Sequence, residues 1–367
     1  MNKIKIICVV GARPNFMKIA PIMDVFSRHP AFGPMLVHTG QHYDEKMSDL
    51  FFRQLAIPRP DVNLEIGSGS HAVQTADVMK AFEPICIKEQ PRAVLVVGDV
   101  NSTIACSLVA SKLGIAVVHV ESGLRSFDRK MPEEINRILT DSISDFLFVT
   151  EKSGIENLKR EGVADERVFL VGNVMVDTLL KFRAKAEQSC RLEDWGVSDG
   201  QYATMTLHRP SNVDDPAVFG RLLGVIEEIQ SQLAIVFPIH PRTRRNIEQM
   251  GFGSRIEAMK NLKLVEPIGY LEFLKLNAHA RVVLTDSGGL QEETTALGVP
   301  CITMRENTER PSTVEIGTNQ LTGTDPVAIL AAWRRVKAGE FAHRGVPEFW
   351  DGKAAERIAD ILAAKLA

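Results

Sequence analysis

The residues with the clearest chemical potential lie between Thr285 and Glu293, a stretch that reads TDSGGLQEE. It follows a short apolar run, and the adjacent Gly288 and Gly289 let a ligand approach the backbone closely. The N–H groups and positive dipole end of a helix starting there suit a phosphate, and an acid shortly afterwards suits a ribose hydroxyl pair. An ordinary strand-to-helix turn, capped by Ser287 or Asp286, would explain the same residues.

Polar residues follow several other short apolar runs in the same way. They are Arg13 and Lys18 after the first run, Asp99 and Glu121 after two later runs, and His208 and His240 in the second half of the chain. Each has an adequate structural explanation alone, as a turn, a cap or a satisfied buried histidine. Ligands of open parallel sheets bind beyond the carboxyl ends of the strands. The repetition of polar residues at the ends of these runs therefore predicts a cleft between two facing domains.

Two kinds of chemistry account for this set of residues. Cations and a glycine-rich turn can neutralise a diphosphate, and the candidate cations are Arg13, Lys18 and Arg310. Carboxylates can take a proton from a sugar carbon and return it, and the candidates are Asp99, Glu121 and Glu133. His208 could assist a departing phosphate. The basic run from Arg242 to Arg245 is better explained as a solvated helix face.

Several cofactor classes are disfavoured. The first strand leads into Gly11-Ala12-Arg13 rather than GxGxxG, so nicotinamide and flavin binding are not expected. HExxH, CxxC and acidic metal clusters are absent from the sequence, so no metal is expected. Lys and Arg number 43 against 46 Asp and Glu, which gives no basic excess for nucleic acid or an anionic membrane.

The 367 residues and 45% hydrophobic content indicate a globular chain of two domains. Its five scattered cysteines indicate a reducing compartment, and we expect a cytoplasmic protein. No stretch approaches the length of a membrane span.

The elements that must position these residues alternate between short strands and helices along the chain, which predicts parallel sheets covered on both faces. The expected strands are 4–10, 35–38, 93–97, 116–120, 146–150 and 168–171, then 202–207, 234–238, 262–265, 281–285 and 300–304. The polar stretch 183–200 separates the two groups. One predicted helix begins at Pro132 and carries Ile135, Ile138, Leu139 and Ile143 on one face. A closing amphipathic helix is expected over 353–366.

Seven blocks together resemble the non-hydrolysing UDP-N-acetylglucosamine 2-epimerases. They are GARPNFMKIAP (11–21), TGQHYD (39–44), GDVNST (98–103), HVESGLRSFD (119–128), MPEEINR (131–137), LTDSGGLQEE (284–293) and MRENTERP (304–311). The resemblance runs from about residue 4 to about residue 360. It implies an α/β, GT-B-like fold of two Rossmann-type doubly wound domains, with 1–180 and the closing helix 350–367 in the first and 181–349 in the second. It also implies a homodimer that binds a UDP-sugar and needs no cofactor.

The resemblance assigns a role to each matching position. The catalytic carboxylates would be Asp99, Glu121 and Glu133, with His208 as the catalytic histidine. Arg13 and Lys18 would be the basic pair near the substrate and its diphosphate, and Gln41 and His42 a pair near the cleft. The remaining UDP contacts would be Ser287, Gly288, Gly289, Glu293, Phe273 and Arg310. The implied reaction expels UDP to give a 2-acetamidoglucal and then adds UDP back.

Two departures from the family pattern bear on the exact sugar and on a second, activating UDP-sugar site. Asn15 stands where many members have an acid, and Leu207–Ser211 replaces Gly-His-Arg-Arg-Glu. An epimerase of a UDP-diacetamido-uronic acid sugar is the alternative within the same reaction class. The residues are also compatible with a hydrolysing epimerase, a GT-B glycosyltransferase or a catalytically silent nucleotide-sugar sensor. The three carboxylates argue against the transferase.

Overall fold

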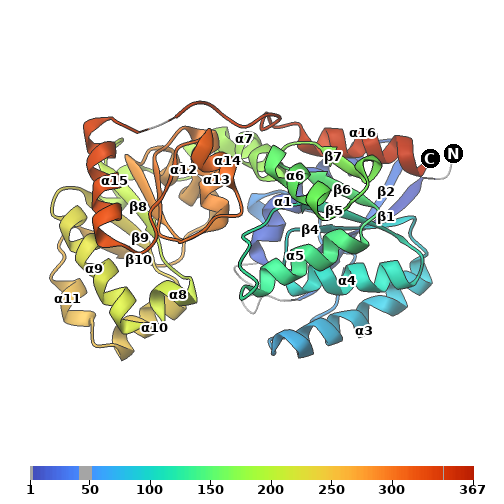
Figure 1. The fold of residues 1–367 in the computed structure, drawn as a ribbon, viewed down its shortest axis with the longest axis horizontal. Helices are drawn as coiled ribbons and strands as arrows, with labels where there is room; N and C mark the ends of the chain where they lie inside the picture. The colour runs from blue at the N-terminus through green and yellow to red at the C-terminus, as the bar shows by residue number, and fades with distance from the viewer. Residues whose placement is uncertain (1–2, 41–51, 342) are drawn as a thin grey trace. The chain divides into compact units, whose positions relative to one another are not determined.

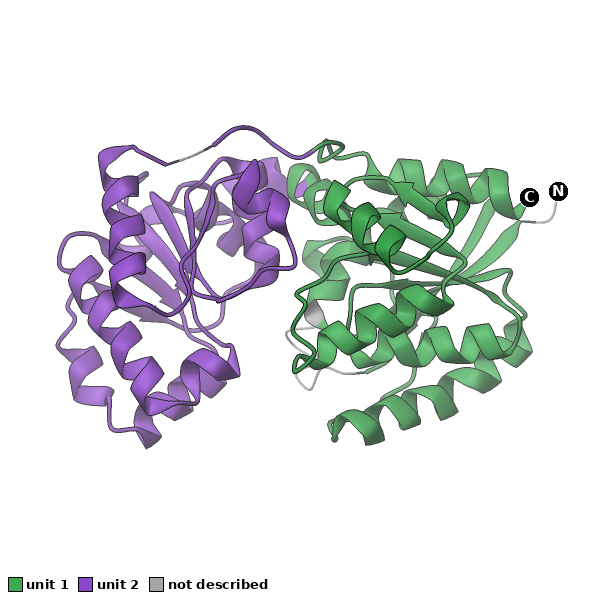
Figure 2. Cartoon of the chain, viewed as in Figure 1, with its two compact units in different colours: residues 1–181, 348–367 green, residues 182–347 purple. Residues whose placement is uncertain are grey.

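The computed structural model describes residues 3–40, 52–341 and 343–367, without the side chain of Arg13. The chain forms two compact units, which Figure 2 shows in different colours. Unit 1 comprises residues 1–181 and 348–367, and unit 2 comprises residues 182–347. Each has a parallel sheet with helices on both faces, so the predicted α/β class with two Rossmann-like domains is confirmed. No helix in the described ranges is long and apolar enough to cross a bilayer.

The sheet of unit 1 has the order β3-β2-β1-β4-β5-β6-β7. Its strands are β1 (Ile4–Val10), β2 (Phe32–His38), β3 (Val62–Asn63), β4 (Ala93–Val97), β5 (Ala116–Ser122), β6 (Phe146–Val149) and β7 (Val168–Leu170). Its helices are α1 (Arg13–Arg28), α3 (His71–Glu89), α4 (Asn101–Lys112), α5 (Pro132–Ile143), α6 (Lys152–Arg160) and α16 (Ala354–Leu366). Helices α3, α4 and α5 cover one face and α16 the other (Figure 1). The strand order reverses between β1 and β4, which is where such sheets bind ligands.

The sheet of unit 2 has the equivalent order, β10-β9-β8-β11-β12-β13. Its strands are β8 (Tyr202–Thr206), β9 (Ala234–Pro238), β10 (Leu262–Val265), β11 (Val282–Thr285), β12 (Cys301–Thr303) and β13 (Asn319–Leu321). Its helices are α8 (Pro210–Val213), α9 (Pro216–Gln230), α10 (Pro241–Gln249), α11 (Gly253–Glu257), α12 (Tyr270–Ala278), α13 (Gly288–Leu297), α14 (Pro311–Glu315) and α15 (Pro326–Ala338). Alternate strand residues enter two separate apolar layers, since Val282 and Leu284 pack with α9 and α15 while Val283 packs with α12 and α13.

Helix α7 (Val174–Glu187) carries the chain from unit 1 into unit 2. The polar stretch expected between the domains begins inside this helix. Its later residues Leu192 and Val197 are buried in the apolar cluster of unit 2, so this stretch is packed rather than a loose linker. The chain returns to unit 1 at residue 348. There the carboxylate of Asp177 accepts hydrogen bonds from the N–H groups of Ala354 and Ala355, which caps α16.

Helix α5 turns charged residues rather than its apolar residues inward. Ile135 and Leu139 are 46% and 47% exposed, whereas Glu134, Arg137 and Asp141 are buried. The three buried charges recur at the spacing of one helix face, so this helix turns a polar face inward. These buried charges are compensated by ion pairs and hydrogen bonds.

Candidate active site

Three adjacent strands of unit 1, β1, β4 and β5, place candidate residues at one edge of the sheet. The strands are parallel neighbours, so the segments that follow them begin at the same edge. Lys18 lies in α1 after β1, Asp99 follows β4, and Glu121 lies near the end of β5. The fold therefore gathers residues that are up to 103 positions apart in the sequence.

Lys18 and Glu121 form an ion pair whose side chains are only 7% and 5% exposed. Glu121 has a φ of 73°, and the register of β5 against β6 shifts at this residue. A bulge therefore turns the carboxylate out of the regular strand, and it imposes a left-handed backbone that a residue with a side chain rarely adopts. Such strain persists only where the surroundings enforce it, and it is concentrated at functional sites.

Gly98 allows this ion pair to lie against the end of β4. Its φ is 68°. A Cβ built there would lie 2.7 Å from Nζ of Lys18 and 3.5 Å from Oε2 of Glu121. Glycine is therefore required by both the backbone conformation and the close approach of the lysine. Asp99, the next residue, is brought close to the pair.

Asp99 and Glu133 line one cavity of about 210 Å³ in unit 1, together with His71, Gln74, Asn101 and Asn136. Two of the three candidate carboxylates thus face the same space, and the third lies beside Gly98, the residue before Asp99. Asn136 donates a hydrogen bond of 2.9 Å to the carbonyl of Asp99. Arg137 forms an ion pair with the Asp99 carboxylate.

A buried network behind this edge was missed by the sequence analysis. Nδ1 of His119 lies 2.6 Å from Oδ1 of Asp141, and its Nε2 lies 2.9 Å from the carbonyl oxygen of Gly98. The other oxygen of Asp141 accepts from the N–H of Gly123 and pairs with Arg125. Burial raises the pKa of Asp141, but His119 and Arg125 lower it more, so the net pKa is below its ordinary value. The network ties the end of β4 to the β5 bulge.

In unit 2, His208 follows β8 and Asp286 follows the neighbouring strand β11. Nδ1 of His208 lies 2.9 Å from Oδ1 of Asp286, whose side chain is fully buried. Oδ2 of Asp286 accepts hydrogen bonds from the N–H groups of His208 and Arg209. Burial opposes ionisation of this acid, but His208 and these N–H groups hold its pKa below the ordinary value. Asp286 therefore orients the histidine rather than capping α13.

The proposed phosphate-binding turn lies at the N-terminus of α13. Ser287 occupies the cap position, but its side chain makes no capping hydrogen bond there, which corrects the expected cap. Nε of Arg310 lies 2.9 Å from Glu292. A Cβ at Gly288 would lie 2.9 Å from Nη1 of Arg310, so the absent side chain lets this guanidinium reach the turn. The helix dipole favours an anion at this turn, whereas the charge of Arg310 is shared with Glu292 and, at 3.1 Å, with Glu309.

Glu293 and Phe273 lie in unit 2 as well. Glu293 is 3% exposed, and burial, reinforced by Glu292, raises its pKa to about 8. Burial therefore favours the protonated form of the candidate ribose-binding acid. Phe273, in α12, is partly buried against the apolar cluster that includes Leu276 and Leu290.

The side chains of three candidate residues lie outside the described part of the structure. Gln41 and His42 lie outside the described residues, and Arg13 begins α1 with its side chain outside them. Among the residues that are described, no group of three or more His, Cys, Asp or Glu side chains could hold a metal ion. Arg242 and Arg244 of the basic run pair with Asp214 and Glu266 on the surface of unit 2, as a solvated helix face would.

Comparisons with known proteins match nearly the whole chain. The family model for UDP-N-acetylglucosamine 2-epimerase matches residues 24–363. The chain belongs to the UDP-N-acetylglucosamine 2-epimerase family. It is 43% identical over 363 residues to the UDP-N-acetylglucosamine 2-epimerase of Methanococcus maripaludis, covering 98% of each chain.

Further relatives in the UDP-N-acetylglucosamine 2-epimerase family are equally long. The crystal structure of the Methanocaldococcus jannaschii UDP-GlcNAc 2-epimerase in complex with UDP-GlcNAc and UDP matches with a TM-score of 0.90 and 42% identity, covering 98% of this chain and 99% of that one. The UDP-2,3-diacetamido-2,3-dideoxy-D-glucuronate 2-epimerase of Pseudomonas aeruginosa is 40% identical over 362 residues, covering 98% of this chain and 99% of its own.

Proposed function

We propose that this protein is a non-hydrolysing epimerase that interconverts UDP-N-acetylglucosamine and UDP-N-acetylmannosamine at C2 of the sugar. Its family membership supports the reaction class. The observation that carries the proposal is the gathering of Asp99, Glu121 and Glu133 around the carboxyl ends of β4 and β5. A glycosyltransferase would not need three carboxylates there.

The proposed reaction begins with removal of the C2 proton. This proton is not acidic enough for simple removal and return, so its loss is coupled to breaking of the C1–O bond. A carboxylate takes the proton, UDP leaves with the electron pair of that bond, and a C1=C2 double bond forms in 2-acetamidoglucal. Return of UDP to C1 and of a proton to the other face of C2 gives the epimer. Asp99, Glu121 and Glu133 share these proton transfers.

The departing UDP carries negative charge, which cationic groups stabilise in the transition state. Lys18 and Arg13 are the proposed cations of unit 1. In unit 2, we assign this role to His208, held by Asp286, and to the turn at Gly288 and Gly289 at the start of α13. Arg310, which Glu292 and Glu309 hold beside the turn, would contact the nucleotide. Glu293 and Phe273 would contact the ribose and the uracil.

A UDP-diacetamido-uronic acid sugar is the second candidate substrate. The P. aeruginosa epimerase, named for a UDP-diacetamido-glucuronate, is 40% identical over nearly its full length, close to the 43% of the M. maripaludis enzyme. The reaction class is the same for both sugars. We favour UDP-N-acetylglucosamine because the family model and the M. maripaludis and M. jannaschii relatives are named for this sugar nucleotide.

We also propose a homodimer in the cytoplasm. The outward apolar residues Ile135 and Leu139 of α5 would face a second copy of the chain. All five cysteines are free, in keeping with a reducing compartment. Light scattering should give a dimer, and the variant Ile135→Glu/Leu139→Glu should be monomeric. A monomeric wild type would overturn this assembly.

Proton NMR of the purified protein with UDP-N-acetylglucosamine in deuterated water tests the function. UDP-N-acetylmannosamine with deuterium at C2, and with the nucleotide still attached, is the expected product. Free N-acetylmannosamine plus UDP would instead identify a hydrolysing enzyme. Absence of both exchange and product would rule out this substrate, and the UDP-diacetamido-uronic acid sugar would then be assayed the same way.

A further inference from the structure

The buried face of α5 carries charge, which calls for an explanation. Glu134, Arg137 and Asp141 are 1%, 2% and 1% exposed. Isolated buried charges are strongly unfavourable, so they are found where partners compensate them. Arg137 has its partner Asp99 in the loop after β4. Glu134 has partners in the loop that follows Glu121.

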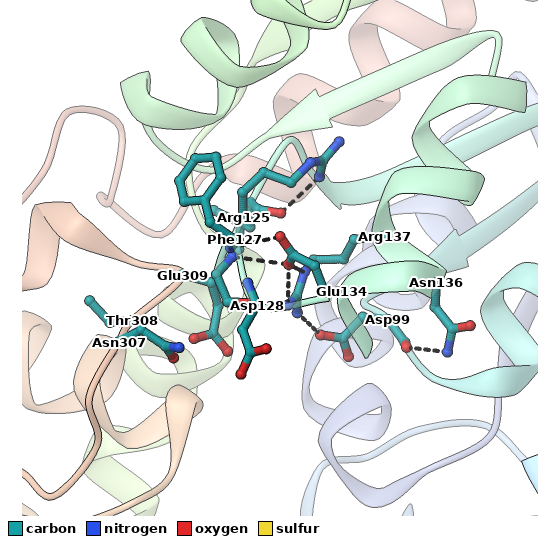
Figure 3. A network of polar contacts seen from close by, with 12 residues as sticks. Asp99, Arg125, Phe127, Asp128, Glu134, Asn136, Arg137, Asn307, Thr308 and Glu309 are labelled. Atoms are coloured by element: carbon teal, nitrogen blue, oxygen red, sulfur yellow. Dashed lines mark hydrogen bonds and ion pairs between the residues drawn. The ribbon is translucent and has the colours of Figure 1, made fainter. Parts of the chain in front are cut away.

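Arg137 lies between two carboxylates. One end of its guanidinium, Nη1, pairs with Oδ2 of Asp99, and the other side donates from Nε and Nη2 to Oε2 of Glu134 at 3.1 and 2.7 Å. Figure 3 shows this arrangement, with Asn136 bound to the backbone of Asp99. A planar guanidinium with fixed donors can serve both acids at once, which a lysine ammonium on its flexible stem cannot do with the same geometry.

Glu134 fixes the orientation of this arginine. Its Oε1 accepts from the N–H of Phe127 at 2.8 Å, and its Oε2 accepts from the N–H of Ser126 at 2.9 Å. Burial works against the charged form, but these N–H groups and Arg137 hold the pKa of Glu134 below its ordinary value. Glu134 is therefore an anion over the whole neutral range, and it keeps Arg137 in place by charge and by two hydrogen bonds.

Asp99 differs from its two partners in exposure. Its side chain is 25% exposed, whereas that of Arg137 is 3% exposed. Asp99 also lines the cavity with Glu133 and Asn136. One oxygen of Asp99 is thus fixed from the protein interior while the residue still reaches the cavity, the arrangement needed for a group that must be both aimed and accessible.

We infer that Arg137 is the positioning residue for the Asp99 carboxylate, and that Glu134 holds Arg137 in turn. Arg137 keeps Asp99 ionised and fixes its direction toward the cavity, so that it receives a proton in a defined geometry. This inference rests on the proposed role of Asp99 in proton transfer. A purely structural salt bridge would affect folding without changing how the active site titrates.

The first test compares Arg137→Ala and Arg137→Lys with the wild type, with Arg160→Ala as a control whose side chain is 69% exposed in a surface pair. A displacement of a reacting group by about 1 Å costs about 100-fold in rate. We therefore expect kcat to fall about 100-fold in Arg137→Ala and at least about tenfold in Arg137→Lys, with KM nearly unchanged. Arg160→Ala should keep wild-type kinetics.

Two readouts separate positioning from folding. Guanidinium chloride at millimolar concentration should restore part of the kcat of Arg137→Ala, and it should not restore Asp99→Asn. The acidic limb of the pH profile of kcat should move to higher pH in Arg137→Ala, because loss of a nearby cation raises the pKa of a carboxyl group. If Arg137→Ala does not fold, the kcat of Arg137→Lys decides the question, because this variant keeps the charge and changes only the geometry of the contact with Asp99.

The outcomes distinguish this inference from the proposed function. Asp99→Asn with normal turnover would remove Asp99 from the mechanism, and the positioning role would go with it. Inactive Asp99→Asn combined with wild-type kcat and pH profile in Arg137→Lys and Arg137→Ala would overturn the positioning role alone. Loss of activity in Arg137→Ala without rescue and without a shifted pH profile would also overturn it.

Discussion

Oδ1 of Asp286 lies 2.9 Å from Nδ1 of His208, and both residues follow neighbouring strands of unit 2. The buried acid also accepts hydrogen bonds from two backbone N–H groups of the His208 loop. The imidazole is therefore held with Nε2 as its remaining ring nitrogen for a ligand. If His208 acts as proposed, Asp286 contributes through the orientation of that histidine, and removal of the acid should lower turnover.

Replacing Asp286 by asparagine should lower kcat by about 10²–10³-fold, the range for loss of one preorganised stabilising group. The double variant with His208→Asn should be no slower than His208→Asn alone, because the two residues act as a unit. Steady-state turnover measured by NMR checks both statements. Asp214→Asn, which alters a surface pair with Arg242, is the control. If the fold-losses in kcat of the two single variants multiplied in the double variant, Asp286 and His208 would not act as a unit.

Substitution at the Lys18–Glu121 pair should separate stability from activity. Glu121→Gln leaves a buried ammonium without its anion, so the free energy of unfolding should fall by about 3–5 kcal/mol. Lys18→Met combined with Glu121→Gln removes both charges and should recover most of that loss. Urea unfolding measures the recovery. Both variants should remain at least about 100-fold slower than the wild type; recovery of turnover along with stability would mean that the pair is structural only.

Gly98→Ala and Gly114→Ala form a matched comparison. Their φ angles are 68° and 70°, so each alanine should cost a similar amount of backbone strain, about 1–2 kcal/mol. Only at Gly98 would the new Cβ meet Lys18, 2.7 Å away, whereas Gly114 has nothing within 4 Å. Turnover should therefore collapse in Gly98→Ala and survive in Gly114→Ala. Equal turnover in the two folded variants would show that the space at Gly98 is not needed.

The buried Glu293 predicts a pH dependence of stability. Its pKa rises from 4.5 to about 8 on burial. Between these values the folded state holds a proton that the unfolded state has released, so the free energy of unfolding falls as the pH rises. Glu293→Gln cannot titrate and should flatten this slope, with the largest gain in stability near pH 8. Urea titrations at pH 5, 6.5 and 8 measure this, and exposed Glu228→Gln should leave the slope unchanged; an unaltered slope in Glu293→Gln would refute the assignment.

Much of the fold could be predicted from the sequence because the central strands are continuous apolar runs. β1, β4, β9 and β10 have the expected bounds, and most others differ by one or two residues. β3 and β13 were not predicted. They have 2 and 3 residues at the edges of their sheets, and an edge strand of this length depends on its neighbour rather than on its own pattern.

The residues of the candidate site also fall into those that the sequence could predict and those that it could not. Residues next to strand ends, such as Asp99 and His208, could be found because the topology of parallel sheets fixes where they lie. Arg137 and His119 could not be assigned a role, because their importance comes from partners 38 and 22 positions away. The buried charged face of α5 is visible in the sequence as the helical spacing of Glu134, Arg137 and Asp141. Solvated charges on an exposed helix face give the same pattern, so the spacing alone could not show that these residues are buried.

Helix α16 has a consequence for how the protein is made. It packs on α1, and its first N–H groups are bound by Asp177, yet it is synthesised after residues 182–347. At about 5–20 residues per second, translation of that intervening unit takes roughly 10–30 s. During this interval the nascent unit 1 presents the apolar surface that Ile358 and Leu362 later cover. Unit 1 therefore completes its own apolar core only after the whole of unit 2 has been translated.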